Sequence, residues 1–443
     1  MKSPIVFPDS TVRGIARRSR EASRSLARLS NERRNEILQA ISRSIEIARD
    51  EILEASERDC MAAEGQLGAE GASRSPLPHV RLRDHAIDEM AMRVRDVAKF
   101  PDPLGRRLSI TELDPGLVLH RTSCPLGVVG VIFESRPDAV PEAAALTLKS
   151  GNALILKGGS GAEWSSQALV SVIRDCLDEF PEVPAHGIEL LPTGTDVGEL
   201  LELDREVDLI IPRGSKELVE HVLAATRIPV LGYGDGMCHV YVDSSADIRK
   251  ALEIITDSKS GPPGRETAAE TLLVHQTIVR DFLPEAVKRL RSSGVELRGC
   301  RKMVALFTSS LVHPASDEDW GKEHCNPLLM IKIVAHVDEA IAHIHRYGSR
   351  RAEVIVTEDS GTANRFMEEV DAAGVFRNAS IRFADVFRHG FGSELGGGTN
   401  EWPGRERVSI EGLTKYKYKL FGNGETVADY SSGKRQFKPR KIE

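Results

Sequence analysis

The chain has 443 residues, with 59 Lys and Arg against 66 Asp and Glu, so its formal net charge is −7. Because a single hydrophobic core stops growing at roughly 250–300 residues, a chain of this length is expected to form at least two packed domains. Nucleic acids and anionic membranes attract clustered Lys and Arg, so the slight acidic excess argues against both as partners. The composition is that of an ordinary globular protein, and we expect its ligand to be a small molecule.

The six cysteines lie far apart and include no Cys-x-x-Cys pair. This spacing is typical of reduced cytoplasmic thiols rather than of a disulfide framework. The N-terminal residues lack the basic and apolar regions of a secretory signal, and no run approaches the roughly 18 apolar residues that span a bilayer. The sequence therefore predicts a cytoplasmic protein without a membrane segment. The cysteines are Cys60, Cys124, Cys176, Cys238, Cys300 and Cys325.

Residues 11–64 are expected to be helical, because isoleucines recur at steps of three or four with Arg and Glu on the opposite face. The arginines alternate with acids, which indicates solvated helix faces rather than a basic patch. A stretch rich in Gly, Ala and Ser at 65–78 predicts a loop, and a further helix is expected at about 80–98. These helices should form a layer against a larger domain.

Two alternating runs flank an Asp-Pro-Gly turn at 114–116 and predict a β-hairpin over 107–123. From residue 126 onward, short apolar runs alternate with helical periods, which is typical of parallel sheets covered by helices on both faces. We therefore predict an α/β fold with two doubly wound domains that meet near residue 257. The predicted strands are 128–133, 153–156, 188–191, 207–211, 230–231 and 239–242, then 271–274, 303–307, 329–334, 352–356 and 374–376, with later helices near 277–293, 337–347 and 361–371.

Two of the predicted strands run into glycine-containing turns. Residues 150–161 read Ser-Gly-Asn-Ala-Leu-Ile-Leu-Lys-Gly-Gly-Ser-Gly, and a Pro-Arg-Gly-Ser turn stands at 212–215. Such turns let the backbone approach a bound group, and the following helix N-terminus favours anions. Neither a G-x-G-x-x-G nor a G-x-x-x-x-G-K-[ST] motif is present, so one turn alone fits a structural role as well as a nucleotide site. Two such turns in one sheet suit a dinucleotide better than either alone.

Histidines and cysteines give no sign of a metal site. Cys238 and His239 are adjacent in a predicted strand and therefore point to opposite faces. The pair His343 and His345 lacks a further ligand at a suitable spacing, as does His324. We expect no metal.

Several longer stretches are more specific than these turns. Together they resemble the γ-glutamyl phosphate reductases, also called glutamate-5-semialdehyde dehydrogenases, of the aldehyde dehydrogenase superfamily, from about residue 29 to 422. The stretches are Leu-Ser-Asn-Glu-Arg-Arg-Asn at 29–35, Cys-Pro-Leu-Gly-Val-Val-Gly-Val-Ile-Phe-Glu-Ser-Arg-Pro at 124–137, Ala-Ala-Ala-Leu-Thr-Leu-Lys-Ser-Gly-Asn at 143–152, Ile-Pro-Arg-Gly at 211–214, Cys-His-Val-Tyr-Val-Asp at 238–243, Glu-Thr-Leu-Leu-Val-His at 270–275 and Asn-Ala-Ser-Ile-Arg-Phe-Ala-Asp at 378–385.

The resemblance implies an aldehyde dehydrogenase-like architecture. The N-terminal helices and dinucleotide-binding domain would comprise 1–106 and 124–256, and the catalytic domain 257–395. The hairpin 107–123 and the return segment 396–422 would form an oligomerisation arm, and the polar tail 423–443 is expected to be mobile. An arm of this kind leaves sheet edges unpaired in a monomer, so a homo-oligomer is expected.

The resemblance also implies a reaction, the NADPH-dependent reduction of L-glutamyl 5-phosphate to L-glutamate 5-semialdehyde in proline biosynthesis. In the family a cysteine thiolate displaces phosphate, and the thioester then accepts hydride. Carried over residue by residue, the site for NADP(H) includes Lys157, Gly159, Pro212, Arg213, Gly214, Ser215 and Glu323. The substrate site includes Arg136, Asp138, Asn378, Ser380 and Arg405, and cations of this kind suit a carboxylate or phosphate ligand.

The sequence departs from the family pattern at the nucleophile. The family cysteine lies four residues before the glutamate of Glu-Thr-Leu-Leu-Val-His, and in this chain that position is Glu266, followed by Thr267 where the family has Asn. Asp138 likewise replaces a family Asn, and Pro-Gly-Arg-Glu-Arg-Val-Ser at 403–409 replaces a segment with a Gly-Pro pair.

Three alternatives follow from these departures. The chain is a reductase that uses another thiol, such as Cys325, or Glu266 acts as a base on water and makes it an acyl phosphatase. In the third alternative Glu266 is an acid on a polar loop, and the chain is a non-catalytic paralogue that binds NADP(H) or substrate and joins an active reductase or glutamate 5-kinase.

Overall fold

The computed structural model describes residues 11–70, 81–232, 236–259, 268–307, 310–322, 324, 327–384 and 410–442. Its internal contacts divide the chain into two units, which are described separately. The first comprises Met1–Gly232, Phe391–Gly396 and Arg407–Glu443, and the second comprises Tyr233–Gly390 and Gly397–Glu406. Among the described residues, no helix is both long and apolar enough to cross a bilayer.

The N-terminal segment is helical as predicted. Capping residues fix where the first two helices begin. The Thr11 and Ser30 hydroxyls accept hydrogen bonds from N–H groups in the first turns of α1 and α2. The regularly spaced isoleucines are buried, including Ile37, Ile41 and Ile45. The third helix extends further than predicted, into the expected loop. The helices are α1 (Val12–Leu26), α2 (Asn31–Ile47), α3 (Arg49–Glu70) and α5 (Asp84–Lys99).

The first unit contains a parallel sheet in the order β5-β4-β3-β6, as the buried apolar runs predicted. The expected strand at 230–231 is only an isolated bridge between Val230 and Ile210. The strands are β3 (Val128–Phe133), β4 (Ala153–Gly158), β5 (Ile188–Leu190) and β6 (Leu209–Arg213), and the helices between and after them are α6 (Ala139–Lys149), α7 (Glu163–Asp178), α8 (Val197–Leu201) and α9 (Lys216–Ala225).

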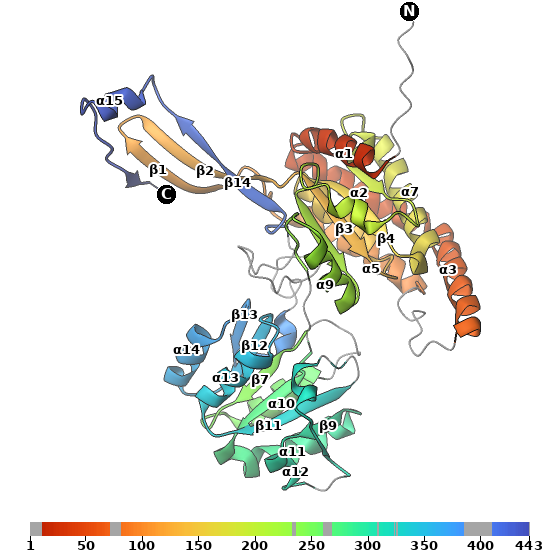
Figure 1. Ribbon diagram of the computed structural model, residues 1–443, viewed down its shortest axis with the longest axis vertical. Helices are drawn as coiled ribbons and strands as arrows, with labels where there is room; N and C mark the ends of the chain where they lie inside the picture. The colour runs from red at the N-terminus through yellow and green to blue at the C-terminus, as the bar shows by residue number, and fades with distance from the viewer. Residues whose placement is uncertain are drawn as a thin grey trace, which may run out of the picture. The chain divides into compact units, whose positions relative to one another are not determined.

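A second sheet of the first unit is the antiparallel arm, in the order β14-β2-β1-β15. The predicted hairpin is present, and Figure 1 shows β1, β2 and β14 side by side. Contrary to the expectation of a mobile tail, the C-terminal residues form a short helix and a strand that pairs with β1. The elements are β1 (Arg107–Asp114), β2 (Leu117–Pro125), β14 (Thr414–Phe421), α15 (Val427–Ser431) and β15 (Arg440–Lys441).

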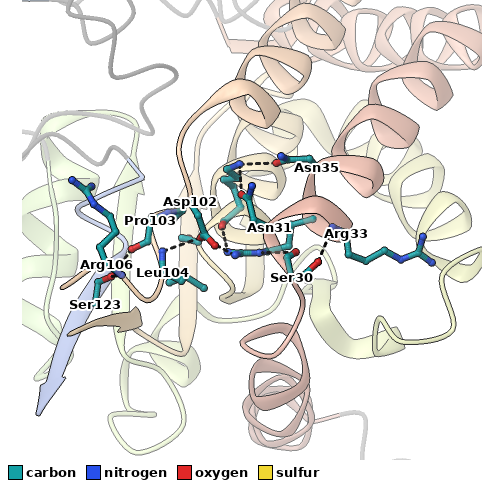
Figure 2. Close-up of polar contacts among 12 residues, drawn as sticks. Ser30, Asn31, Arg33, Asn35, Asp102, Pro103, Leu104, Arg106 and Ser123 are labelled. Carbon is teal, nitrogen blue, oxygen red and sulfur yellow. Dashed lines mark hydrogen bonds and ion pairs between the residues drawn. The ribbon is translucent and has the colours of Figure 1, made fainter. Parts of the chain in front are cut away.

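A buried polar network holds the base of this arm (Figure 2). Arg34, which is 1% exposed, donates from Nη2 to Asp102 Oδ1 at 2.7 Å, and the same oxygen accepts the Leu104 N–H at 2.9 Å. The Ser123 hydroxyl of β2 donates to the Pro103 carbonyl at 2.7 Å and accepts the Arg106 N–H at 2.9 Å. The chain entering β1 is therefore tied to both α2 and β2.

Lys149 extends this network from the end of α6. Its ammonium donates to the side-chain oxygens of Asn31 at 2.8 Å and Asn35 at 2.6 Å, and burial lowers its pKa to about 8. Asn152, three residues later, donates to the Leu413 carbonyl at 2.9 Å, directly before β14. Two of the stretches that carry the resemblance, 29–35 and 143–152, thus meet at the base of the arm.

The second unit contains a parallel sheet in the order β10-β9-β11-β8-β7-β12-β13. Because β7 pairs with β8 and β12, residues 239–256 belong to this unit, whereas the sequence placed them with the cofactor domain. The predicted strand at 303–307 is wrong, since α12 and a turn occupy it. The strands are β7 (His239–Val242), β8 (Thr271–His275), β9 (Glu296–Gly299), β10 (His313–Pro314), β11 (Leu328–Val334), β12 (Ala352–Val356) and β13 (Gly374–Arg377).

The apolar faces of these strands are covered by helices. The leucines and phenylalanines of α10 and α11, among them Leu252, Phe282 and Leu290, pack in one cluster with β7, β8 and β11. Phe366 of α14 and Ile341 of α13 pack in another cluster, with Tyr241 and Ile355. The helices are α10 (Ile248–Lys259), α11 (Val279–Ser292), α12 (Arg301–Val304), α13 (Val337–Tyr347) and α14 (Ser360–Glu369).

Candidate functional site

In the first unit, the predicted cofactor residues lie along one edge of the parallel sheet. β3 is the middle strand, and its Ile132 is level with Lys157 of β4 on one side and Pro212 of β6 on the other. The Gly159 N–H donates to the Phe133 carbonyl at 2.9 Å, directly beyond the strand ends. In open α/β sheets, ligands bind outside the carboxyl ends of the strands, where these residues are.

Lys157 is the buried cation of this edge. Its side chain is 7% exposed, and Nζ donates to the Gly158 carbonyl at 2.8 Å. Burial lowers the pKa of the ammonium, while the carboxylate of Glu163 acts in the opposite direction. A buried donor at the end of a strand can bind a hydroxyl or a phosphate oxygen with little loss of side-chain entropy.

The turn at 212–215 is held by Glu134, which the sequence analysis missed. The Glu134 N–H donates to the Arg213 carbonyl at 2.9 Å, and its carboxylate accepts the Ser215 N–H at 2.7 Å. A Cβ on Gly214 would clash with the Glu134 carboxylate, so a larger residue fits there only if this side chain moves. The Ser215 hydroxyl caps α9 by accepting the Leu218 N–H at 3.3 Å.

The other glycine turn leads into a helix whose N-terminus already holds an anion. The Asp59 carboxylate of α3, which is buried, accepts the Trp164 N–H at 3.0 Å and the Ser165 N–H at 2.9 Å, together with the Ser165 hydroxyl. The helix dipole and these N–H groups therefore stabilise a side chain of this protein. No sequence pattern connects Asp59, a hundred residues upstream, with this turn.

Arg136 and Asp138 form an ion pair on the segment after β3. Arg136 Nη2 lies 3.0 Å from Asp138 Oδ2, and Arg136 Nε lies 3.5 Å from Asp138 Oδ1. Burial opposes ionisation of Asp138, but the charges of Arg136, Arg213 and Arg93 outweigh it and hold the pKa of this carboxyl below its usual range. The preceding Ser135 has a φ of +47°, a conformation that non-glycine residues adopt rarely. Asp138 thus binds the cation that the sequence assigns to the substrate.

In the second unit, the segment that carries position 266 has both of its ends fixed. Lys259 at the end of α10 and Glu270 before β8 form a buried ion pair, with Nζ 2.7 Å from Oε1. The Ala269 N–H donates to the Ser258 carbonyl at 2.9 Å, and the Glu270 N–H to the Cys238 carbonyl at 3.0 Å. Glu266 itself lies outside the described residues, as do Glu323 and Arg405.

The predicted substrate residues Asn378 and Ser380 have well-defined surroundings. Asn378, with a φ of +51°, accepts the Thr357 N–H at 2.9 Å and donates to the Thr357 carbonyl at 3.0 Å. The Ser380 hydroxyl lies 3.2 Å from that of Ser258, which also accepts the Ile381 N–H at 3.2 Å. Ser380 therefore contacts the residue next to Lys259, whereas the Asn378 amide is engaged at the end of β12.

A buried polar cluster lies beside this segment. His239 Nδ1 is 3.0 Å from Glu353 Oε2, and both side chains are fully buried. Glu353 of β12, His239 of β7 and Thr271 of β8 are paired with one another across the sheet. Thr271 directly follows Glu270 in the sequence. The His343 ring contacts that of His239 at 5.5 Å, and burial lowers its pKa to about 2. In the described part of the chain, no three His, Cys, Asp or Glu side chains are arranged to hold a metal ion.

The described cysteines differ in exposure. Cys238 is fully buried, and burial beside Glu353 raises the pKa of its thiol to about 12. Cys60 and Cys176 are buried in the first unit, whereas Cys124 and Cys300 are partly exposed. Since only a thiolate is a strong nucleophile, Cys238 cannot supply one at neutral pH.

The fold and the strand-end site define a class of protein. Residues 8–301 match the model of the aldehyde dehydrogenase family, whose members use a nicotinamide cofactor. A glyceraldehyde-3-phosphate dehydrogenase of Methanocaldococcus jannaschii, solved with NADP, shares the fold at a TM-score of 0.63 and 16% identity, covering 95% of this chain and 96% of its own.

Closer relatives specify the family. A γ-glutamyl phosphate reductase of Synechococcus sp. (strain JA-2-3B'a(2-13)) is 48% identical over 93% of this chain and 90% of its own length. The crystal structure of γ-glutamyl phosphate reductase from Thermotoga maritima matches with a TM-score of 0.87 at 38% identity, covering 93% of this chain and 98% of that one. The chain belongs to the γ-glutamyl phosphate reductase family.

Proposed function

We propose that this protein binds NADP(H) and acts on the couple of L-glutamyl 5-phosphate and L-glutamate 5-semialdehyde. The observation that carries the proposal is the turn at 212–215, which Glu134 holds at the same edge of the sheet as the buried Lys157, in a chain 48% identical to a named reductase. The glycines of these turns would let a dinucleotide approach the backbone at the strand ends, and Lys157 would supply a cation there.

We assign the individual residues by the same reasoning. Lys157, Gly159, Pro212, Arg213, Gly214, Ser215 and Glu323 would bind the cofactor. We assign Arg136, Asp138, Asn378, Ser380 and Arg405 to the substrate. The arginines can pair with the carboxylate and phosphate of glutamyl phosphate, since guanidinium groups bind both in a bidentate manner.

A second candidate function rests on Glu266. A carboxylate at the nucleophile position gives no thioester, and its attack on an acyl phosphate would form an anhydride that water cleaves. Among the described cysteines, Cys238 is a protonated, buried thiol. This substitution favours a non-catalytic paralogue. Such a protein would bind NADP(H) or substrate and would join glutamate 5-kinase or an active reductase in the cytoplasm.

The arm supports a homo-oligomer under either function. Strand β14 is an edge strand of the arm sheet, and most of its residues are exposed. An exposed edge presents main-chain donors and acceptors that a strand of another chain can satisfy. We therefore propose that the protein assembles with copies of itself.

One assay distinguishes the two functions. The phosphate-dependent oxidation of glutamate 5-semialdehyde by NADP+ is followed for the wild type, Glu266→Cys and the isosteric control Glu266→Gln. Turnover by the wild type that Glu266→Gln abolishes supports a reductase in which Glu266 takes part. Turnover confined to Glu266→Cys supports the non-catalytic paralogue with an intact pocket.

Cofactor binding is measured in parallel by thermal shift with NADPH, and Lys157→Ala is the control for the assigned site. We expect NADPH to raise the Tm of the wild type and to act more weakly on Lys157→Ala. If none of the variants turns over and NADPH leaves the wild-type Tm unchanged, the proposed function is wrong.

A further inference from the structure

The C-terminal residues complete the arm sheet on the side of β1. Strand β15 pairs antiparallel with β1, with Thr111 opposite Lys441 and Glu112 opposite Arg440. The Lys438 N–H donates to the Leu113 carbonyl at 2.8 Å, and the Ile442 N–H to the Ile110 carbonyl at 2.9 Å. These bonds satisfy carbonyl groups that an edge strand would otherwise present to solvent.

Side chains fix the tail on this edge. Asp114, at the end of β1, accepts the Tyr430 hydroxyl at 3.1 Å and lies 3.6 Å from the Arg435 guanidinium. The rings of Tyr430 and Phe437 stack at 4.2 Å, and the Arg440 guanidinium lies 2.9 Å from Glu112. The tail thus combines main-chain pairing with side-chain contacts ahead of β15 and at its first residue.

The opposite edge of the sheet differs. In the described part of the chain, β14 has a strand partner on one side only, β2. Its Tyr416, Tyr418 and Leu420 share one face and are 47%, 61% and 57% exposed. The other face carries three lysines that alternate with them: Lys415, Lys417 and Lys419.

The position of β14 on the first unit is fixed at its base. Asn152 binds the Leu413 carbonyl directly before the strand, and the Lys415 ammonium donates to the Leu126 carbonyl at 2.7 Å. The network of Arg34, Asp102 and Ser123 holds the hairpin on which β14 lies (Figure 2). The unpaired edge is therefore presented by an anchored sheet rather than by a loose strand.

We propose that the C-terminal residues 423–442 are an edge cap on β1: the sheet ends on that side in the two-residue strand β15, and β14 is the one long edge strand of the arm offered to a second copy of this chain. This proposal rests on the homo-oligomer in the proposed function. A sheet with two open edges can pair β14 of one arm with β1 of the next, and such head-to-tail contacts repeat without closing. With β1 covered by a strand of two residues, the edge on that side is too short to pair with β14 of another arm in that series.

A second copy fits the open edge in chemistry as well. The exposed aromatic residues of β14 match the enrichment of Tyr at protein interfaces, and its lysines meet a chain whose net charge is −7. Alternating Lys residues also weaken pairing with a like strand, since like charges opposite each other are unfavourable. The edge thus favours an acidic surface of the partner copy.

The test compares the full chain with a chain that ends at Asn423. Molar mass is measured by size-exclusion chromatography with light scattering across a wide range of concentration. We expect one mass above that of the monomer for the full chain, and for the shortened chain a mass that grows with concentration by about twofold or more as arms join. A shortened chain that keeps the full chain's mass at every concentration overturns the edge cap.

A second pair of variants covers the case in which the shortened chain fails to fold. Lys438→Pro with Ile442→Pro removes the two N–H donors to β1 and keeps the tail. Lys441→Pro is the matched control, because the N–H groups of neighbouring strand residues point in opposite directions and Ile442 is the one bonded to β1. We expect the molar mass of the double variant to increase with concentration, and that of Lys441→Pro to stay the same as for the wild type. Equal behaviour of the two overturns the proposal.

The outcomes separate this inference from the proposed function. A full chain that is monomeric at every concentration overturns the second copy on β14, whatever the semialdehyde assay shows. Loss of NADPH binding and turnover with the expected masses intact overturns the proposed function and leaves the edge cap standing.

Discussion

The cofactor residues of the first unit and the nucleophile segment of the second lie at opposite ends of parallel strands. In the first unit these residues follow the carboxyl ends of β3, β4 and β6. In the second, the segment with position 266 enters β8 at its amino end, one residue before the row of Glu353, His239 and Thr271. Both sheets are parallel, so the same strand arrangement serves two kinds of site.

The polar groups at the two ends differ in exposure. The ion pair Arg136–Asp138 in the first unit keeps side-chain exposures of 36% and 28%, whereas Lys259–Glu270 in the second has 3% and 6%. In a partly exposed ion pair, either side chain can leave its partner for a ligand at low cost in free energy. A buried ion pair keeps one geometry, because separating the two groups leaves an uncompensated charge in the protein interior. The first edge is suited to admit a ligand and the second to hold a chain segment still.

The buried pair of the second unit should give the largest effect. Lys259→Met leaves the Glu270 carboxylate without its ammonium partner in a buried site, and we expect a loss of about 3–5 kcal/mol in the free energy of unfolding. Hydrogen exchange in peptides covering 248–275, together with denaturant unfolding, measures it. The double variant Lys259→Met/Glu270→Leu should recover most of the loss, because both charges are gone. A single variant as stable as the wild type contradicts a structural role for the pair.

A smaller effect is expected from the cofactor turn. In Gly214→Ala the new methyl group would stand against the Glu134 carboxylate, and overpacking of this kind costs roughly 1–3 kcal/mol. The variant should also bind NADPH more weakly, which calorimetry detects. In the double variant Gly214→Ala/Glu134→Ala, most of the steric cost should be gone, but the turn should still lack the hydrogen bond of the Glu134 carboxylate. Equal NADPH affinity in all three proteins would show that the turn does not contact the cofactor.

His343 should make the second unit sensitive to acid. Burial lowers its pKa in the folded protein to about 2, against an ordinary value of 6.5, so the folded state binds fewer protons than the unfolded chain. The contribution of His343 to the free energy of unfolding is therefore fully present above pH 6.5. It decreases as the pH falls below 6.5, by at most about 1.4 kcal/mol per pH unit. Denaturant unfolding from pH 8 to pH 5 should show this slope for the wild type and a shallower one for His343→Phe. If the free energy of unfolding changed equally with pH in both proteins, His343 would not be the source of the acid sensitivity.

The half-exposed pair of the first unit should give the smallest change in stability. Asp138→Asn removes the carboxylate that pairs with the Arg136 guanidinium and should alter the free energy of unfolding by less than about 1 kcal/mol. Inorganic phosphate, used as the probe, should bind more tightly by about fivefold, or ~1 kcal/mol. Isothermal titration measures this gain, and Arg136→Met in the same chain should abolish it. An unchanged affinity would mean that Arg136 does not face an anion site.

Much of the fold could be predicted from periodicity. The strands at 128–133, 239–242 and 352–356 have the predicted bounds, because short runs in which nearly every residue is apolar are buried on both faces of a parallel sheet. Strand β9 was missed, since Glu296-Leu-Arg-Gly carries a single apolar side chain and depends on pairing with β11. The apolar run at 303–307 predicts a strand, but its first residues belong to a helix that follows Cys300.

The candidate site was predictable only as residue types. Lys157 and the turn at 212–215 follow predicted strands, and the sequence places both at carboxyl ends. The roles of Glu134 and Asp59 could not be predicted, since each acts on a backbone 81 or more residues away in the sequence. The pairing of Lys259 with Glu270 across the nucleophile segment likewise depends on where α10 ends relative to β8.

The sequence by itself determined the periodic elements, the family and the carboxylate at position 266, because these depend on local pattern and residue identity. Tertiary structure decided which groups satisfy one another. The anion at the α7 N-terminus is Asp59, the partner of Arg136 is Asp138, and the edge of β1 is covered by a tail that its polar composition assigned to solvent. Main-chain donors and carboxylates are alike at every position in the chain, so only the folded arrangement selects their partners.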